Sequence, residues 1–205
     1  MKSKQEKQNE LKHCSNLMLY ANLFSTLFYS ASYPYIYAEL LKVVPRSYIS
    51  IEEITACLGA VVFCKIWNKH TDKLFRHYHI ILIIEMIADF ILFADVLIRN
   101  DLKFYFILNI SIFAVVTRNL ICGGNKMRSI VNPTEKLREQ YDNNCTIINS
   151  IATLSGAGIA LVLNLDLTIL FILALIGNVI DNIFYLIVFK KIKLYRNEDC
   201  ENEKH

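Results

Sequence analysis

The stretch from Lys65 to His79, KIWNKHTDKLFRHYH, decides the fold of this chain. It is a dense polar and basic run with a strongly apolar segment on each side. Two apolar segments that flank a short charged loop are typical of two membrane helices that turn back at the same face of a bilayer. Because basic side chains are costly to translocate, we expect this loop to lie in the cytoplasm.

The composition fits a membrane protein better than a soluble domain. Of the 205 residues 54% are hydrophobic, and the mean hydropathy is +0.34, whereas soluble domains contain about 45–50% apolar residues. Charged residues gather in the tails and short loops, as a bilayer requires. The net charge of +3 therefore reflects membrane topology, and we expect a lipid bilayer and no nucleic acid among the partners.

Six apolar segments can be placed outward from the loop. Most Lys and Arg residues lie in the N-terminal tail, in the loop itself, between residues 118 and 138, and after residue 189. This bias predicts an all-α polytopic protein with six transmembrane helices and both termini in the cytoplasm. The expected helices are 15–41, 49–67, 77–98, 104–122, 143–163 and 168–189. The expected domains are a cytoplasmic tail at 1–14, a transmembrane domain at 15–190 and a second cytoplasmic tail at 191–205.

Glycine, proline and small residues add local predictions. Gly123 and Gly124 should end the fourth helix. The fifth helix should begin at Asn132-Pro133-Thr134-Glu135, with Asn132 as its cap and Pro133 at its first position. The small residues Ser155 to Gly158 would allow another helix to approach closely, and Gly59-Ala60 on the second helix would do the same.

Ionisable residues inside the apolar segments are candidates for function. In the third segment Glu85 should lie roughly 12 Å and Asp89 roughly 18 Å above the cytoplasmic end. Arg118 in the fourth segment and Asp181 in the sixth should lie near the depth of Glu85. We expect Arg118 to pair with Glu85 or Asp181. Asp89 is the expected proton-coupling group, and a purely structural ion pair is the alternative.

The sequence gives no indication of an enzyme or a cofactor. It contains no HExxH pattern, nucleophile elbow or phosphate-binding loop. The cysteines show no CxxC or His-linked spacing, so they predict neither a metal site nor a disulfide framework. We expect them to be small apolar fillers: Cys14, Cys57, Cys64, Cys122, Cys145 and Cys200.

The loop at residues 68–77 resembles the signature loop of the major facilitator superfamily, G-x-L-x-D-R-x-G-R-R. Asp72, Lys73, Arg76 and His77 stand at its charged positions, while Asn68 and Phe75 replace its two glycines. The stretch from Arg118 through Gly123, and then residues 130–161, is similar to the fourth helix, long internal loop and fifth helix of the macrolide-efflux-like drug exporters of that superfamily. The chain resembles their N-terminal six-helix half, which is half of a twelve-helix transporter.

This resemblance implies a module for secondary transport, with efflux of a small amphiphilic molecule across a bacterial plasma membrane. It implies a substrate cavity lined by polar residues of the first and fourth helices: Asn22, Tyr29, Tyr33, Asn109 and Arg118. It implies a cytoplasmic gating loop at Asp72, Lys73 and Arg76, and a partner that supplies the missing half, either a second copy or a separate six-helix chain. A truncated membrane protein without transport activity, or an immunity or assembly factor, is the alternative.

Overall fold

The computed structural model describes residues 4–43, 45–99, 113–163 and 166–202, and all its regular elements there are helical. This confirms the all-α prediction. The elements are α1 (Lys4–Val43), α2 (Arg46–Arg76), α3 (Tyr78–Arg99), the short π-helix η1 (Phe113–Thr117), α5 (Arg118–Val131), α6 (Glu135–Leu163) and α7 (Leu167–Asn202).

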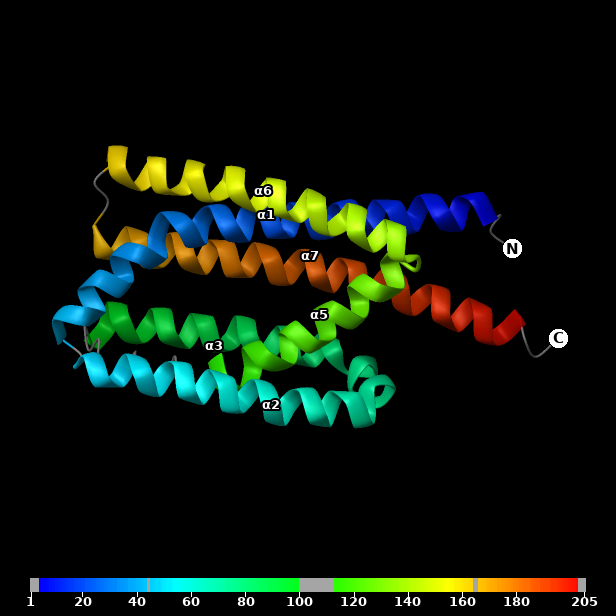
Figure 1. The fold of residues 1–205 in the computed structure, drawn as a ribbon, viewed down its shortest axis with the longest axis horizontal. Coiled ribbons are helices and arrows are strands. Elements are labelled where there is room, and N and C mark those ends of the chain that lie inside the picture. Colours follow the sequence, from blue (N-terminus) through cyan, green and yellow to red (C-terminus); the bar gives the residue numbers. More distant parts are fainter. Residues whose placement is uncertain (1–3, 44, 100–112, 164–165, 203–205) are drawn as a thin grey trace.

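The long helices form two groups that run along the same axis (Figure 1). In one group α1 packs against both α6 and α7; the other contains α2 and α3, which contact each other little. α3 packs on α7, and α5 crosses obliquely from α2 towards the start of α6, which joins the two groups. Both termini lie at the same end of the bundle.

Most helices are longer than the apolar segments predict. α1 begins at Lys4, inside the expected tail at 1–14, and α7 runs to Asn202, through most of the expected tail at 191–205. α6 begins at Glu135, eight residues before the apolar segment at 143, as the helix-start pattern at residues 132–135 predicts. These extensions are polar and lie at the helix ends, where residues such as Lys, Glu and Gln favour helix without being apolar. Residues 104–112 of the expected fourth helix lie outside the described ranges.

The prediction of a loop over residues 65–79 was wrong for most of its length. α2 continues to Arg76, with one non-helical residue, His70, at φ −131° and ψ 28°. Trp67 and Phe75, which flank this bend, are 3% and 4% exposed. Their burial in the core at this end of the bundle explains why the chain stays helical, because tertiary packing outweighs local polarity. Only His77 separates α2 from α3.

The predicted end of the fourth helix at Gly123 and Gly124 was also wrong, because α5 continues to Val131. A Cβ atom on Gly123 would lie 2.0 Å from Cε2 of Tyr78, and Tyr78 is 1% exposed. This glycine thus makes room for a buried ring on α3, as small residues do where helices pack closely.

Thr134, and not Asn132, caps the start of α6. The Thr134 hydroxyl accepts a hydrogen bond from the Leu137 amide at 3.3 Å, as a capping side chain does for the third helical residue. Asn132 instead ends α5. Its side chain accepts a hydrogen bond from the Ser15 hydroxyl at 3.1 Å, so it is occupied by a contact with α1.

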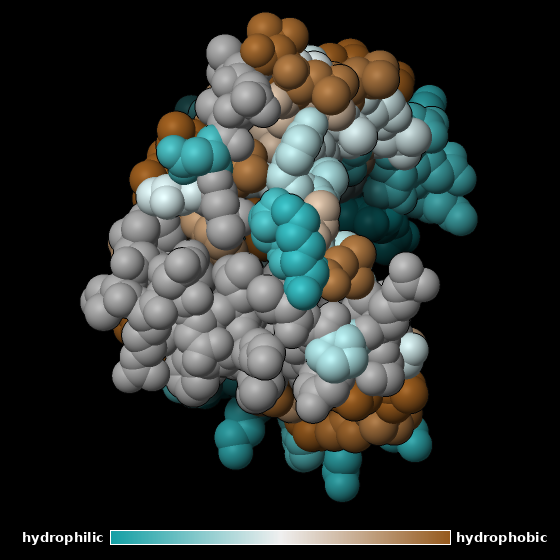
Figure 2. Space-filling view, turned by 90° about the vertical axis from the view of Figure 1, so that its left-hand side faces the viewer, coloured by the Kyte–Doolittle hydropathy of each residue, from teal (hydrophilic) through white to brown (hydrophobic). Residues whose placement is uncertain are grey.

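Large apolar side chains cover much of the outer surface of the bundle. On α6 the exposed fractions are 77% for Leu154 and 82% for Val162, and on α2 they are 58% for Ile54 and 62% for Leu58. Seen end-on, apolar residues lie at the top and bottom of the molecule, where α6 and α2 run (Figure 2). Surfaces of this kind mark contact with lipid or with another protein.

Two of the described helices are long and apolar enough to cross a membrane. They are Glu135–Val162 and Thr168–Lys193. The membrane prediction is thereby supported for α6 and α7, and the number of crossings and the location of the termini stay predictions.

A polar ladder joins α1 to α6. Asn22 meets Tyr141 and Cys145, Thr26 donates to Asn149 at 3.1 Å, and Ser30 donates to Thr153 at 3.4 Å. From Cys145 to Thr153 the rungs keep a constant sequence offset of 123 residues, so the two helices run parallel.

Close packing of α1 on α6 depends on Gly156. A Cβ atom there would lie 2.4 Å from the Leu27 carbonyl oxygen and 3.0 Å from the Ala31 amide nitrogen. The small-residue patch on this helix is thus divided between two faces. Gly156 is buried against α1, whereas Gly158 has nothing within 4 Å of its Cβ position and Ser155 is exposed.

We expect Gly156→Ala to lower the free energy of unfolding by about 1–3 kcal/mol, because the new methyl group meets backbone atoms that cannot move away. Gly158→Ala is the matched control on the same helix. It should leave stability unchanged or raise it by up to about 1 kcal/mol, because alanine favours helix and the space is open. Thermal unfolding in detergent would measure both. Equal effects of the two substitutions would contradict the α1–α6 packing.

Candidate functional site

Three carboxyl groups gather inside the bundle where α3 packs on α7. Glu85 and Asp89 lie one turn apart on α3, so they share a face of that helix. Asp181 lies on α7, and both aspartates are close enough to Glu85 for an electrostatic interaction between the carboxyl groups. Glu85 is 8% exposed. The structure therefore brings together all three acidic residues that the sequence singled out within the membrane segments.

Two neutral side chains support this carboxyl cluster, defined as Glu85, Asp89 and Asp181. The Thr117 hydroxyl donates a hydrogen bond to Oε1 of Glu85 at 3.2 Å. Asn178 lies one turn before Asp181 on α7, and its side chain lies close to the Asp89 carboxyl group. Thr117 is the last residue of η1, and single π-helical turns within longer helices frequently occur at functional sites.

Each carboxyl group of the cluster keeps one buried oxygen without a hydrogen-bond partner among the described residues. These atoms are Oε2 of Glu85, Oδ2 of Asp89 and Oδ1 of Asp181. A buried anion without a partner is costly, and neighbouring anions raise that cost. Protonation relieves both costs, so a cluster of this kind is suited to take up and release protons as a coupled group.

The predicted partner of this cluster, Arg118, begins α5 one residue after Thr117. Its side chain lies outside the described part of the structure, as does the whole of Asn109. The Arg118 ion pair and the cavity role of Asn109 therefore stay predictions.

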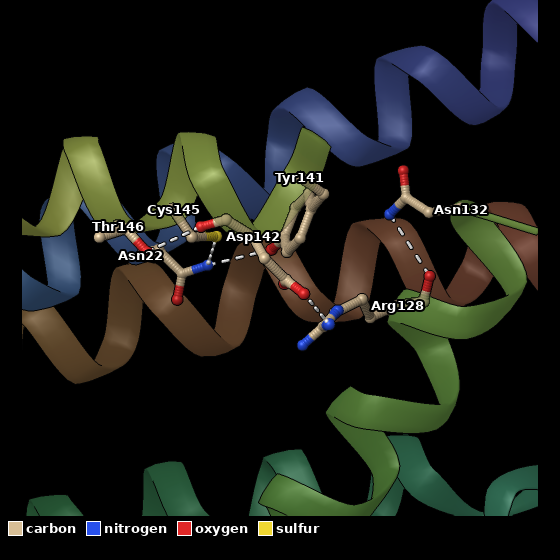
Figure 3. Close-up of polar contacts among 7 residues, drawn as sticks. All are labelled: Asn22, Arg128, Asn132, Tyr141, Asp142, Cys145 and Thr146. Atoms are coloured by element: carbon tan, nitrogen blue, oxygen red, sulfur yellow. Dashed lines mark hydrogen bonds and ion pairs between the residues drawn. The ribbon is translucent and has the colours of Figure 1, made fainter. Parts of the chain in front are cut away.

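A second polar network connects α1, α5 and α6 near the start of α6 (Figure 3). The Asn22 amide donates to the Tyr141 hydroxyl at 3.1 Å and to the Cys145 sulfur at 3.6 Å. It also donates to the Met18 carbonyl oxygen at 3.0 Å. The Asn22 side chain, which the resemblance placed in a substrate cavity, is therefore engaged between two helices.

Arg128 of α5 closes this network at the end where α5 meets α6. Its guanidinium forms an ion pair with Asp142 and lies 5.8 Å from the ring centroid of Tyr141. Both members of the ion pair are partly exposed, so its contribution to stability is small. Its clearer effect is to fix the angle between α5 and α6, because one side chain contacts two consecutive residues of the second helix.

Comparison with protein-family models, curated proteins and solved structures gives no match.

Tyr29 and Tyr33, the other two cavity candidates, belong to an aromatic ladder along α1. Their ring centroids are 4.5 Å apart with an interplanar angle of 15°, and Tyr33 continues to Tyr37 at 5.8 Å. Tyr29 is 51% exposed. The three tyrosines thus form a column of stacked rings along α1, and aromatic rings are groups that attract other apolar rings and organic cations.

The expected gating residues Asp72, Lys73 and Arg76 lie on the last turns of α2, beyond the bend at His70. All three are exposed, while Phe75 among them is buried against Tyr78 and Phe189. Phe75 stands where the family motif has its second glycine. The buried ring of Phe75 holds this end of α2 against the core, which a glycine at this position could not do.

Among the described residues, no group of three or more His, Cys, Asp or Glu side chains is placed to hold a metal ion. Cys14 is fully buried, and burial raises the pKa of its thiol, so it is a poor target for labelling.

Sequence reasoning missed two residues of the carboxyl cluster's surroundings, Thr117 and Asn178. A signal for Asn178 was available, because it lies three residues before Asp181 and so shares its helix face. Thr117 carried no such signal. Its contact with Glu85 depends on how α3 packs against η1, which spacing along the chain does not reveal.

Proposed function

We propose that this chain is a membrane transport module in which Glu85, Asp89 and Asp181 couple substrate movement to protons. The observation that carries the proposal is the burial of these three carboxyl groups between two otherwise apolar helices, with an unpartnered oxygen on each among the described residues. Ionisable residues at such depth are costly in a membrane protein and mark ion and substrate paths.

The pairing of the helices supports a transporter of the kind that the sequence resembles. α1, α2 and α3 form the first three segments, and η1–α5, α6 and α7 form the last three. In this comparison α1 corresponds to η1–α5, α2 to α6, and α3 to α7. The contact of α1 with α6 then corresponds to that of η1–α5 with α2, and the contact of α1 with α7 corresponds to that of η1–α5 with α3. Each of these contacts in one triplet therefore has an equivalent in the other. Such equivalence is expected of the three-plus-three repeats in each half of a major facilitator transporter.

We propose that the substrate is a small amphiphilic molecule with an aromatic or cationic part. The aromatic side chains Tyr29, Tyr33 and Tyr37 on α1 support this choice, and Tyr29 among them is half-exposed. A six-helix unit with both ends in the cytoplasm can combine with a second copy in the same orientation, or with a separate six-helix chain. The exposed apolar faces of α2 and α6 leave room for that partner.

Transport by proteoliposomes tests this proposal. Vesicles containing the chain alone would be loaded in turn with a panel of fluorescent amphiphilic drugs, and a pH gradient would then be imposed. We expect drug movement above that of protein-free vesicles and of a Glu85→Gln/Asp89→Asn/Asp181→Asn triple variant. Movement by the chain alone indicates a functional homodimer, and movement only after addition of proteins from neighbouring reading frames indicates a separate partner. No movement in either preparation, from a chain that retains its helical circular dichroism, would favour a membrane protein without transport activity.

A further inference from the structure

Cys64 of α2 and Cys122 of α5 face each other across a helix interface. Their sulfur atoms are 3.9 Å apart although the residues are 58 positions apart in the sequence. Cys64 is exposed and Cys122 is half-buried. A small uncharged oxidant such as hydrogen peroxide can therefore reach the Cys64 thiol from outside the bundle, while the Cys122 thiol lies within the contact between the helices.

The neighbouring turn holds this pair of cysteines in register. Trp67, three residues after Cys64, donates from Nε1 to Oδ1 of Asn119, three residues before Cys122, at 2.8 Å. Trp67 is 3% exposed, so the bond lies within the packed interface. A disulfide requires the sulfurs to close to about 2.05 Å, and a change of side-chain rotamer at the exposed Cys64 contributes to this approach.

We infer that Cys64 and Cys122 form a peroxide-sensitive dithiol that links α2 to α5 when oxidised. The Cys64 thiolate attacks hydrogen peroxide, forming a sulfenic acid and, after proton transfer, one water molecule. The Cys122 thiol then attacks the sulfenic sulfur, forming the disulfide and a second water molecule. Two thiols are oxidised and one peroxide is reduced to two water molecules. A thiol reductant restores the dithiol, so the bond would be transient in a reducing compartment.

Cys57 provides a matched control. It lies on the same helix, two turns before Cys64, and is also exposed. A reaction governed by exposure alone would oxidise Cys57 and Cys64 at similar rates. The juxtaposition separates their products, because Cys122 captures the sulfenic acid of Cys64 as a disulfide, whereas the sulfenic acid of Cys57 is left to oxidise further to sulfinic acid.

The test treats the purified full chain in detergent with hydrogen peroxide and then blocks the remaining thiols with N-ethylmaleimide under denaturing conditions. Digestion and mass spectrometry should find a peptide pair linked through Cys64 and Cys122 that dithiothreitol separates. Dithiothreitol should return Cys64 to a thiol that reacts with maleimide, whereas Cys57 should accumulate sulfinic acid, which dithiothreitol does not reduce. Cys64→Ser and Cys122→Ser should each abolish the link, and Cys57→Ser should leave it intact. Conversion of Cys64 to sulfinic acid as complete as that of Cys57, or capture of Cys64 by any other cysteine, would overturn the inference.

Discussion

Asp89→Asn is expected to abolish proton-coupled transport while leaving the bundle folded. Asparagine keeps the shape of the side chain and can still lie beside Asn178, the neighbour of Asp89 on α7. It cannot bind and release a proton. In proteoliposomes, drug movement should fall to the level of protein-free vesicles and lose its dependence on the pH gradient. Thermal stability should not fall, because the change removes one of three adjacent buried carboxyl groups.

Glu139→Gln is the matched control for Asp89→Asn. Glu139 lies on an exposed part of α6, outside the carboxyl cluster, so its neutralisation should leave both transport and stability unchanged. If drug movement by Asp89→Asn depended on the pH gradient as it does in the parent chain, Asp89 would not be the proton-coupling group. If it destabilised the bundle by several kcal/mol, the carboxylate would have a structural role.

Arg118→Leu should have the largest effect on stability. If its side chain pairs with Glu85 or Asp181, as its predicted depth suggests, then removing the cation leaves a buried carboxylate without a counter-charge. Such a loss typically costs about 3–5 kcal/mol. A second substitution, Glu85→Gln or Asp181→Asn, should restore more than half of the loss. Thermal unfolding of the single and double variants in detergent measures this coupling.

Arg128→Leu provides the comparison for Arg118→Leu. Arg128 also pairs with a carboxylate, Asp142, but both side chains are partly exposed. Its loss, including the contact with the Tyr141 ring, should cost about 1–2 kcal/mol. If Arg118→Leu were no more destabilising than Arg128→Leu, or if neither second substitution rescued it, Arg118 would have no buried carboxylate partner.

The hydropathy of the chain was enough to locate most of the helices and the acidic residues inside them. The cores of α1, α2, α3, α6 and α7 fall where the apolar segments predict, because burial away from water requires continuous apolar sequence whatever the tertiary arrangement. The helix ends were harder to predict. In the run at residues 65–79, the burial of Trp67 and Phe75 keeps a polar sequence helical, and no local pattern distinguishes this from a loop.

The close approach of a helix at Gly156 was predicted from the small residues around it, but most individual contacts between helices could not be predicted from the sequence. Asn22 has the same local surroundings whether it lines a cavity or bonds to Tyr141, and only the parallel register of α1 and α6 decides between them. Gly123 was predicted to end a helix, but it lies within α5 and leaves space for the Tyr78 ring of α3. The Cys64–Cys122 contact likewise depends on how α2 crosses α5. Each of these features depends on two helices and not on one.

Every functional role proposed for this chain depends on six membrane crossings, and labelling of introduced cysteines measures them most directly. In a variant without native cysteines, single cysteines would replace Gln8, Asn68, Pro45 or Asp166, which are all exposed. An impermeant maleimide added to intact cells should label Pro45→Cys and Asp166→Cys, at the turns between α1 and α2 and between α6 and α7. It should label Gln8→Cys and Asn68→Cys only after the membrane is permeabilised. Labelling of Gln8→Cys or Asn68→Cys in intact cells, or protection of Asp166→Cys until permeabilisation, would contradict the six-crossing arrangement.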